Sequence, residues 1–169
     1  MPYFAGLRQN SVELQERIRT LNADLGLSLG NGFISPKTFT IPEFGMLNVH
    51  SEVLPRYQNA QSIIWPIYCN DPFTGFTIHE IERKIDGGRI LFQQRTAILF
   101  EKTLEMTVRK SRAMVENQIP AALAEVCLHF GDYRSRAAAQ SGGCSYTTPS
   151  IWQYLRMVRN NRRFYAATH

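Results

Sequence analysis

The residues from Arg89 to Asn117 belong to the longest stretch of this sequence that contains no glycine or proline. Apolar residues recur along it at intervals of three, four and seven, which is the repeat of an α-helix with one buried face. A helix of this length would extend over about 40 Å, more than a small compact domain requires. We therefore expect one long helix over about residues 89–117, with the rest of the fold packed on it.

The N-terminal half of the chain is richer in proline and glycine and has less helical periodicity. Asn10 or Ser11 is placed to cap a helix that runs to about Leu25, and the preceding residues 1–10 are too few to fold alone. Residues 27–75 contain five prolines among several glycines, and no helical repeat survives in them. This segment is predicted to be extended and to wrap either the helical core or a neighbouring subunit.

Three shorter helices are expected around the long one. Residues 77–86 begin with a capping pair and end at two glycines, a second helix starts near Pro120, and a third starts at Thr148 and Pro149. The sequence thus predicts a mainly α fold with little β structure. It would be a single domain over residues 1–169, with an arm at 1–10, an extended wrapping segment at 27–75 and a helical core at 77–165.

Charge is distributed unevenly along the chain. Residues 1–88 hold seven Lys or Arg and nine Asp or Glu, whereas residues 89–169 hold twelve and five. No acidic residue follows Asp132. This asymmetry makes the basic half a candidate surface for a polyanion or for an acidic partner.

The basic residues fall into three clusters, on the last helix, on the long helix and after the Pro120 helix. Guanidinium groups next to aromatic rings suit phosphate neutralisation with base stacking, although a solvated amphipathic helix has the same composition. The candidate nucleic-acid-binding residues are Arg156, Arg159, Arg163, Arg109, Lys110, Arg112, Arg134 and Arg136, with Trp152 and Tyr154 for aromatic stacking.

Catalytic and metal-binding patterns are weak in this sequence. His79-Glu80 resembles the start of a zinc-binding HExxH pattern, but Arg83 stands where the second histidine would be. Cys144 lies in a glycine-rich turn without an assignable histidine partner, and Asp86 with its two glycines reads as a boundary between helices. We therefore predict no catalytic residue, no metal, no cofactor and no enzymatic activity.

The functional hypothesis that follows is a structural assembly protein, a capsid or nucleocapsid-type subunit. It would bind other copies of itself and RNA or single-stranded DNA through its basic half. Alternatives are an accessory subunit of a respiratory or ribosomal complex, or a helix-turn-helix DNA-binding regulator. Without a signal-peptide pattern or a long apolar run, the expected location is the cytoplasm or an assembled virion, with no membrane span and no secretion.

Overall fold

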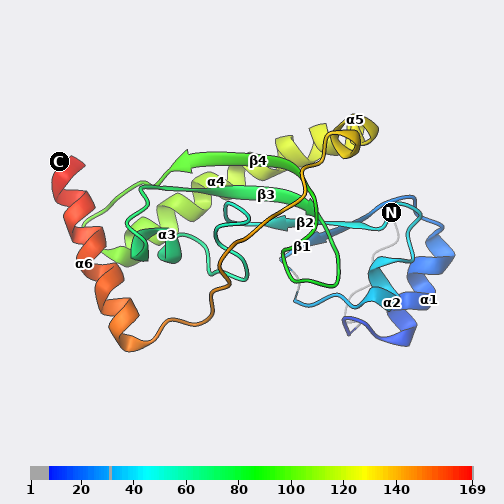
Figure 1. Ribbon diagram of the computed structural model, residues 1–169, viewed down its shortest axis with the longest axis horizontal. Coiled ribbons are helices and arrows are strands. Elements are labelled where there is room, and N and C mark those ends of the chain that lie inside the picture. The colour runs from blue at the N-terminus through cyan, green and yellow to red at the C-terminus, as the bar shows by residue number, and fades with distance from the viewer. Residues whose placement is uncertain (1–7, 31, 169) are drawn as a thin grey trace.

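A four-stranded mixed sheet forms the centre of the computed structural model, which describes residues 8–30 and 32–168 (Figure 1). The strand order is β1-β2-β3-β4, where β1 and β2 are parallel and the other neighbours are antiparallel. The strands are β1 (Gly26–Leu29), β2 (Met46–His50), β3 (Phe73–Glu80) and β4 (Ile90–Ala97). This arrangement, mixed α and β, contradicts the predicted mainly α class.

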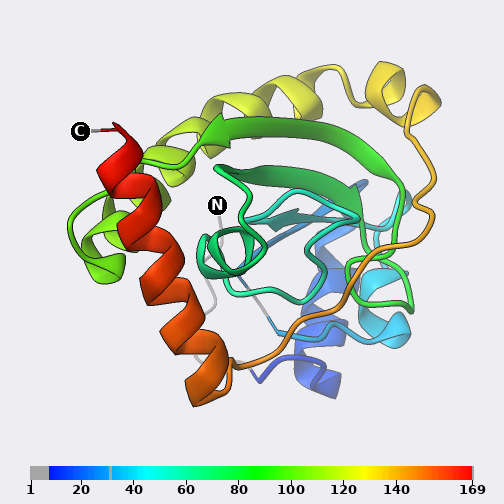
Figure 2. The same cartoon turned by 60° about the vertical axis from the view of Figure 1, so that its left-hand side comes forward.

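Helices surround the sheet. α4 runs along one face of it, and α3 and α6 pack together at one end (Figure 2). The helices are α1 (Val12–Leu21), α2 (Pro36–Phe39), α3 (Ile64–Tyr68), α4 (Leu104–Leu128), α5 (Phe130–Ser135) and α6 (Ile151–Thr168).

Two apolar clusters hold these layers together. One lies between the sheet and α4 and contains Leu47, Phe76 and Val126. The other lies at the α3 and α6 end and contains Trp65 and Met157. Burial of such side chains, at about 1.5–3 kcal/mol each, is the main force that fixes the layers.

The expected helix over residues 89–117 is wrong in its first half. Residues 90–97 form β4, and α4 begins only at Leu104, where the Thr103 hydroxyl accepts a hydrogen bond from the Met106 N–H. β4 lacks an apolar alternation because its inner face is partly polar. The Gln94 amide and the Thr96 hydroxyl both donate to the Gln118 side chain of α4, at 2.9 and 3.2 Å.

The expected helix over residues 77–86 is also wrong, because β3 extends to residue 80. Thr77, which looked like a helix cap, donates its hydroxyl to the Glu52 carbonyl oxygen at 2.7 Å. Glu80, its presumed capping partner, pairs instead with Arg89 at 2.8 Å. Thr77 and Glu80 have the spacing of a helix-capping pair, but both side chains make tertiary contacts instead.

Residues 27–75 are not one extended segment, since they contain β1, β2 and the short helices α2 and α3. Pro36 opens α2, and Pro66 lies inside α3. α4 also continues through Pro120, where a new helix was expected. The 1–10 arm lies outside the described residues except for its last three.

Two predicted helices are confirmed with small shifts. Ser11 caps α1, which ends at Leu21, short of the expected Leu25, and Asn22 follows it in a left-handed conformation. α6 begins two residues after Pro149. There the Ser150 and Gln153 side chains exchange hydrogen bonds with each other's backbone N–H groups, at 3.3 and 2.8 Å.

Candidate active site

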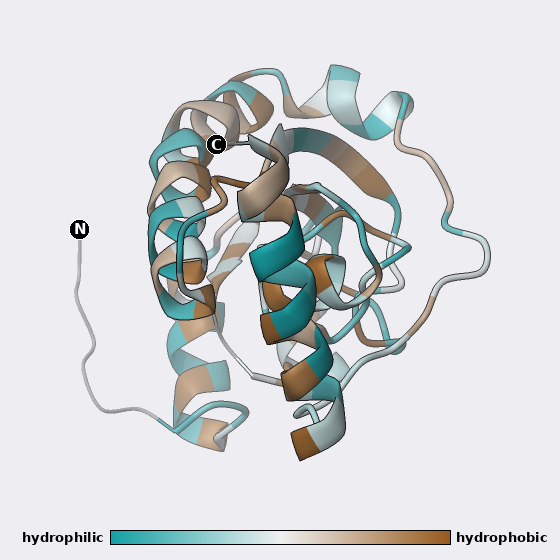
Figure 3. Ribbon diagram, turned by 90° about the vertical axis from the view of Figure 1, so that its left-hand side faces the viewer, coloured by the Kyte–Doolittle hydropathy of each residue, from teal (hydrophilic) through white to brown (hydrophobic). Residues whose placement is uncertain are grey.

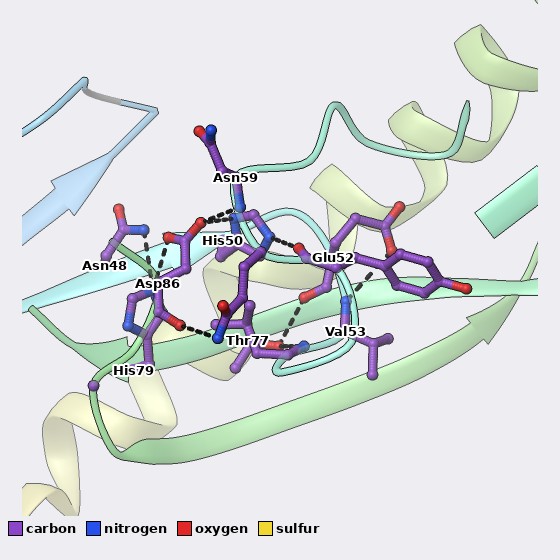
Figure 4. A network of polar contacts seen from close by, with 12 residues as sticks. Asn48, His50, Glu52, Val53, Asn59, Thr77, His79 and Asp86 are labelled. Atoms are coloured by element: carbon purple, nitrogen blue, oxygen red, sulfur yellow. Dashed lines mark hydrogen bonds and ion pairs between the residues drawn. The ribbon is translucent and has the colours of Figure 1, made fainter. Parts of the chain in front are cut away.

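Polar side chains gather where β2 ends and β3 passes beside it (Figure 4). Asn48 and His50 are two residues apart on β2, so their side chains leave the same face of the sheet. His79 is the β3 residue directly opposite Asn48. Asp86, in the loop that connects β3 to β4, completes the group.

Asp86 sits at the centre of this group. Its carboxylate lies 3.5 Å from Nδ1 of His50 and 3.6 Å from Nε2 of His79. It also accepts a hydrogen bond of 2.7 Å from the Asn59 N–H. Burial alone would raise the pKa of Asp86, but the adjacent imidazole rings of His79 and His50 and the hydrogen bond from the Asn59 N–H outweigh it and lower that pKa. The carboxylate is therefore ionised at neutral pH.

The loop around Asp86 is held in place by backbone geometry and by one distant side chain. Asp86 adopts a left-handed conformation with φ 51°, which aspartate tolerates better than most residues. Gly88, two residues later, approaches the Glu80 backbone so closely that a Cβ atom would collide with the Glu80 carbonyl group. The Gln140 amide donates to the Asp86 and Gly88 carbonyl oxygens at 2.9 and 2.6 Å, which fixes the loop from outside.

The tautomer of His50 follows from its contacts. Its Nε2 lies 2.7 Å from the Tyr57 carbonyl oxygen, which can only accept, so Nε2 carries the proton. Nδ1 of the neutral ring therefore presents a lone pair toward Asp86. Burial lowers the pKa of His50, the Asp86 carboxylate and the Tyr57 carbonyl oppose this effect, and the neighbouring His79 adds to it. His50 is thus a neutral base at pH 7, next to a carboxylate that stabilises its protonated form.

Asn48 has a similarly defined orientation. Nδ1 of His79 lies 2.8 Å from the Glu80 carbonyl oxygen and donates to it, and in this tautomer Nε2 accepts from the Asn48 amide at 3.2 Å. One amide hydrogen of Asn48 is used in this way. Its second hydrogen remains available to a substrate oxygen.

These side chains line a hollow of about 460 Å³, a volume typical of small-molecule sites. Its wall also carries apolar side chains, among them Ile34, Val49 and Ile81. The buried Ser62 hydroxyl lies in the same wall and has no hydrogen-bond partner among the described residues.

Within residues 8–30 and 32–168 no cluster of three or more His, Cys, Asp or Glu side chains is arranged to hold a metal ion.

The predicted nucleic-acid-binding residues are not brought together. α5 and α6 lie at opposite ends of the molecule (Figure 1). Arg134 is on α5 and Arg136 directly follows it, whereas α6 carries Arg156, Arg159 and Arg163. Several of the guanidinium groups already have protein contacts: Arg134 with Glu80 at 3.5 Å, Arg163 with Asn70 at 2.6 Å, and Arg156 over the Tyr68 ring at 4.4 Å.

The long-helix cluster is divided in the same way. Arg109 is exposed on α4, Lys110 pairs with Glu101, and Arg112 lines the hollow. Trp152 and Tyr154 are exposed on α6. Figure 3 shows hydrophilic and hydrophobic residues side by side along this helix. Nucleic-acid contact at these residues stays a prediction.

Sequence reasoning missed Asn48, His50 and Asp86. They are distant from one another along the chain, and none is part of a local pattern of catalytic residues. The available signal was the Asn-Val-His alternation at the end of an apolar strand, followed later by Asp-Gly-Gly. That signal was lost because residues 27–75 were read as extended and 77–86 as helical.

Comparison with known proteins identifies the group to which this arrangement belongs. The sequence profile of the formyl transferase family matches residues 4–123, and this region contains every side chain of the site. The chain belongs to the formyl transferase family. The predictions of a capsid or other structural protein, of a virion location and of no enzymatic activity are therefore wrong.

Individual relatives agree with the family assignment. The methionyl-tRNA formyltransferase of Ehrlichia ruminantium is 35% identical over 100 residues, which cover 59% of this chain and 33% of the relative. That of Idiomarina loihiensis is 30% identical over 142 residues, which cover 83% and 44%. The chain thus spans less than half the length of these relatives.

A solved structure shows the same fold. The formyltransferase PseJ from Anoxybacillus kamchatkensis superimposes with a TM-score of 0.62 at 23% identity, over 90% of this chain and 76% of that protein. The fold is therefore the α/β formyltransferase fold, built on the mixed sheet described above.

No helix among the described residues combines the length and the apolar character needed to cross a bilayer.

Proposed function

We propose that this protein transfers a formyl group from a carrier to an amine, with Asn48, His50 and Asp86 as its catalytic residues. The observation that carries the proposal is the position of the neutral His50. Its basic Nδ1 lies 3.5 Å from the ionised Asp86 carboxylate, and the Asn48 amide lines the same hollow. These are the groups that acyl transfer to an amine requires.

The reaction forms one carbon–nitrogen bond and breaks another. The acceptor amine attacks the formyl carbon, and the formyl oxygen gains negative charge, which the free Asn48 amide hydrogen stabilises. Nδ1 of His50 takes the proton from the attacking amine, and Asp86 stabilises the resulting imidazolium. His50 then returns this proton to the carrier nitrogen as the original carbon–nitrogen bond breaks. No net oxidation or reduction occurs.

A reduced folate is the carrier class that we propose. The PseJ structure contains tetrahydrofolate. In this chain, the hollow combines apolar side chains, which suit a heteroaromatic ring, with polar residues of β1 and of the loop around Asp86. When bound, such a carrier supplies the activated formyl group.

The acceptor that we propose is methionyl-tRNA, because the relatives with 30% and 35% identity are named for this substrate. The PseJ structure instead contains a formamido sugar linked to UDP, at 23% identity. Both acceptors present a primary amine, so the chemistry at His50 would be the same for either.

Label transfer from formyl-labelled tetrahydrofolate tests the proposal. Methionyl-tRNA and a UDP-linked amino sugar are offered separately, and we expect label on methionyl-tRNA. Asn48→Ala should lower the rate by about 10²–10³-fold, the effect of removing one donor to an oxyanion. The exposed Asn117→Ala serves as the matched control and should leave it unchanged. Equal rates for Asn48→Ala and wild type would remove Asn48 from the mechanism.

A further inference from the structure

The loop over residues 51–63 connects the catalytic His50 to α3, and its backbone supplies two of the contacts that define the site. The Tyr57 carbonyl oxygen orients His50, and the Asn59 N–H orients Asp86. The geometry of the site therefore depends on how this loop is held.

Glu52 closes the base of the loop. Its side chain is fully buried, and Oε1 accepts hydrogen bonds from the Ile63 N–H at 2.6 Å and the Thr74 hydroxyl at 2.9 Å. The Glu52 carbonyl oxygen accepts from Thr77, also on β3, at 2.7 Å. One residue thus joins the start of the loop to its last residue and fastens both to β3. Figure 4 shows Glu52 next to Thr77 of this strand.

The end of the loop needs such an anchor. Ile63 adopts φ 73° and ψ −45°, and the Ile64 N–H donates to the Ser62 carbonyl oxygen at 2.9 Å, which defines a γ-turn. A positive φ is rare for a β-branched residue and persists only where the surroundings enforce it. The Ile63 side chain is buried in the core, and its N–H is the group that Glu52 binds.

We propose that Glu52 is a positioning residue for the active site: its buried carboxyl group holds the 51–63 loop closed, so that the loop backbone keeps His50 and Asp86 in their working orientation. Its role is distinct from catalysis, because none of its contacts is with the reacting groups. The functional importance of Glu52 rests on the proposed function. Its effect on the orientation of His50 and Asp86 can be measured in the free protein.

The charged groups around Glu52 do not replace this anchor. Asp71 is a charged group that acts on Glu52, and it is already engaged by Arg56 at 2.9 Å and Arg95 at 3.2 Å. The Tyr57 hydroxyl also donates to Asp71, at 3.1 Å. On the other side, His50 faces Asp86 and His79. Among the described residues no hydrogen bond or ion pair links a cation to the Glu52 side chain, whose donors are the Ile63 and Val53 N–H groups and the Thr74 hydroxyl.

Histidine ring NMR across a pH series tests the proposal without any substrate. Glu52→Asp keeps the carboxyl group but withdraws it by one methylene, Glu52→Ala removes it, and Glu52→Gln keeps an acceptor oxygen. We expect the His50 pKa to stay near its wild-type value in Glu52→Gln. It should move upward, toward the 6.5 of a solvated imidazole, in the other two. The exposed Glu16→Asp is the matched control and should not move it.

Amide hydrogen exchange at Asn59 gives a second readout. Loss of the anchor should speed this exchange by roughly tenfold relative to Val49 of β2, the effect of weakening one hydrogen bond. If Glu52→Ala does not fold, Glu52→Asp decides the matter. The proposal would be overturned if the Glu52→Asp variant had the wild-type His50 pKa and the wild-type rate of Asn59 amide exchange. Because neither readout uses a formyl donor, this failure is separate from failure of the transfer assay.

Discussion

Replacing Glu52 with glutamine should change how the stability of the protein depends on pH. Burial raises the pKa of Glu52 from 4.5 to about 7, against the opposing hydrogen bonds of the Ile63 N–H, the Thr74 hydroxyl and the Val53 N–H. A carboxyl group with a raised folded-state pKa stabilises the fold fully below its unfolded-state pKa of 4.5 and loses this contribution as pH rises through about 7. The total loss is on the order of 3 kcal/mol.

Urea unfolding followed by tryptophan fluorescence measures this effect at a series of pH values from about 5 to 8. Glutamine does not titrate, so the free energy of unfolding of wild type minus that of Glu52→Gln should fall by about 2–3 kcal/mol over this range. The contributions of His50 and Asp86 are common to both proteins and cancel in the difference. A difference that does not vary with pH would refute the assignment of a protonated, buried Glu52.

Three further predictions concern the site, the core and the surface. The rate of formyl transfer should fall only below pH 6.5, because burial lowers the pKa of His50, and a pH profile of kcat/KM measures this. Leu47→Ala should lower the free energy of unfolding by about 2–5 kcal/mol, whereas the exposed Leu128→Ala should change it by less than about 0.5, as measured by urea denaturation. A triple alanine variant of the α6 arginines should weaken single-stranded RNA binding and lower its log-log salt slope by roughly 0.7 per lost phosphate contact in a fluorescence anisotropy titration. The three arginines are Arg156, Arg159 and Arg163.

Helix ends with strong capping chemistry could be predicted from the sequence. The start of α1 at Ser11 and the last helix after Pro149 depend on side chains within three residues of the helix end, so the local sequence contains their cause. The second half of the long helix was also predictable, because Val115 lies on an apolar face with a helical repeat.

The sheet could not be predicted because its polar positions are satisfied by distant partners. Gln94 and Thr96 of β4 bind Gln118, which is more than 20 residues away, and Thr77 of β3 binds the Glu52 carbonyl group. Read locally, those residues suit a helix surface or a helix cap. The site depends on the sheet, because the pairing of β2 with β3 and the return of the Asp86 loop bring its residues together.

The most direct test of the active centre compares two histidine variants in the same transfer assay. His50 lies partly buried beside Asp86, whereas His129 is exposed at the end of α4, 3.7 Å from Glu125. If His50 moves the proton, His50→Ala should lower kcat/KM by about 10²–10⁴-fold, and His129→Ala should leave it at the wild-type value. Formyl transfer by His50→Ala at the wild-type rate would contradict the assignment of this site as the active centre.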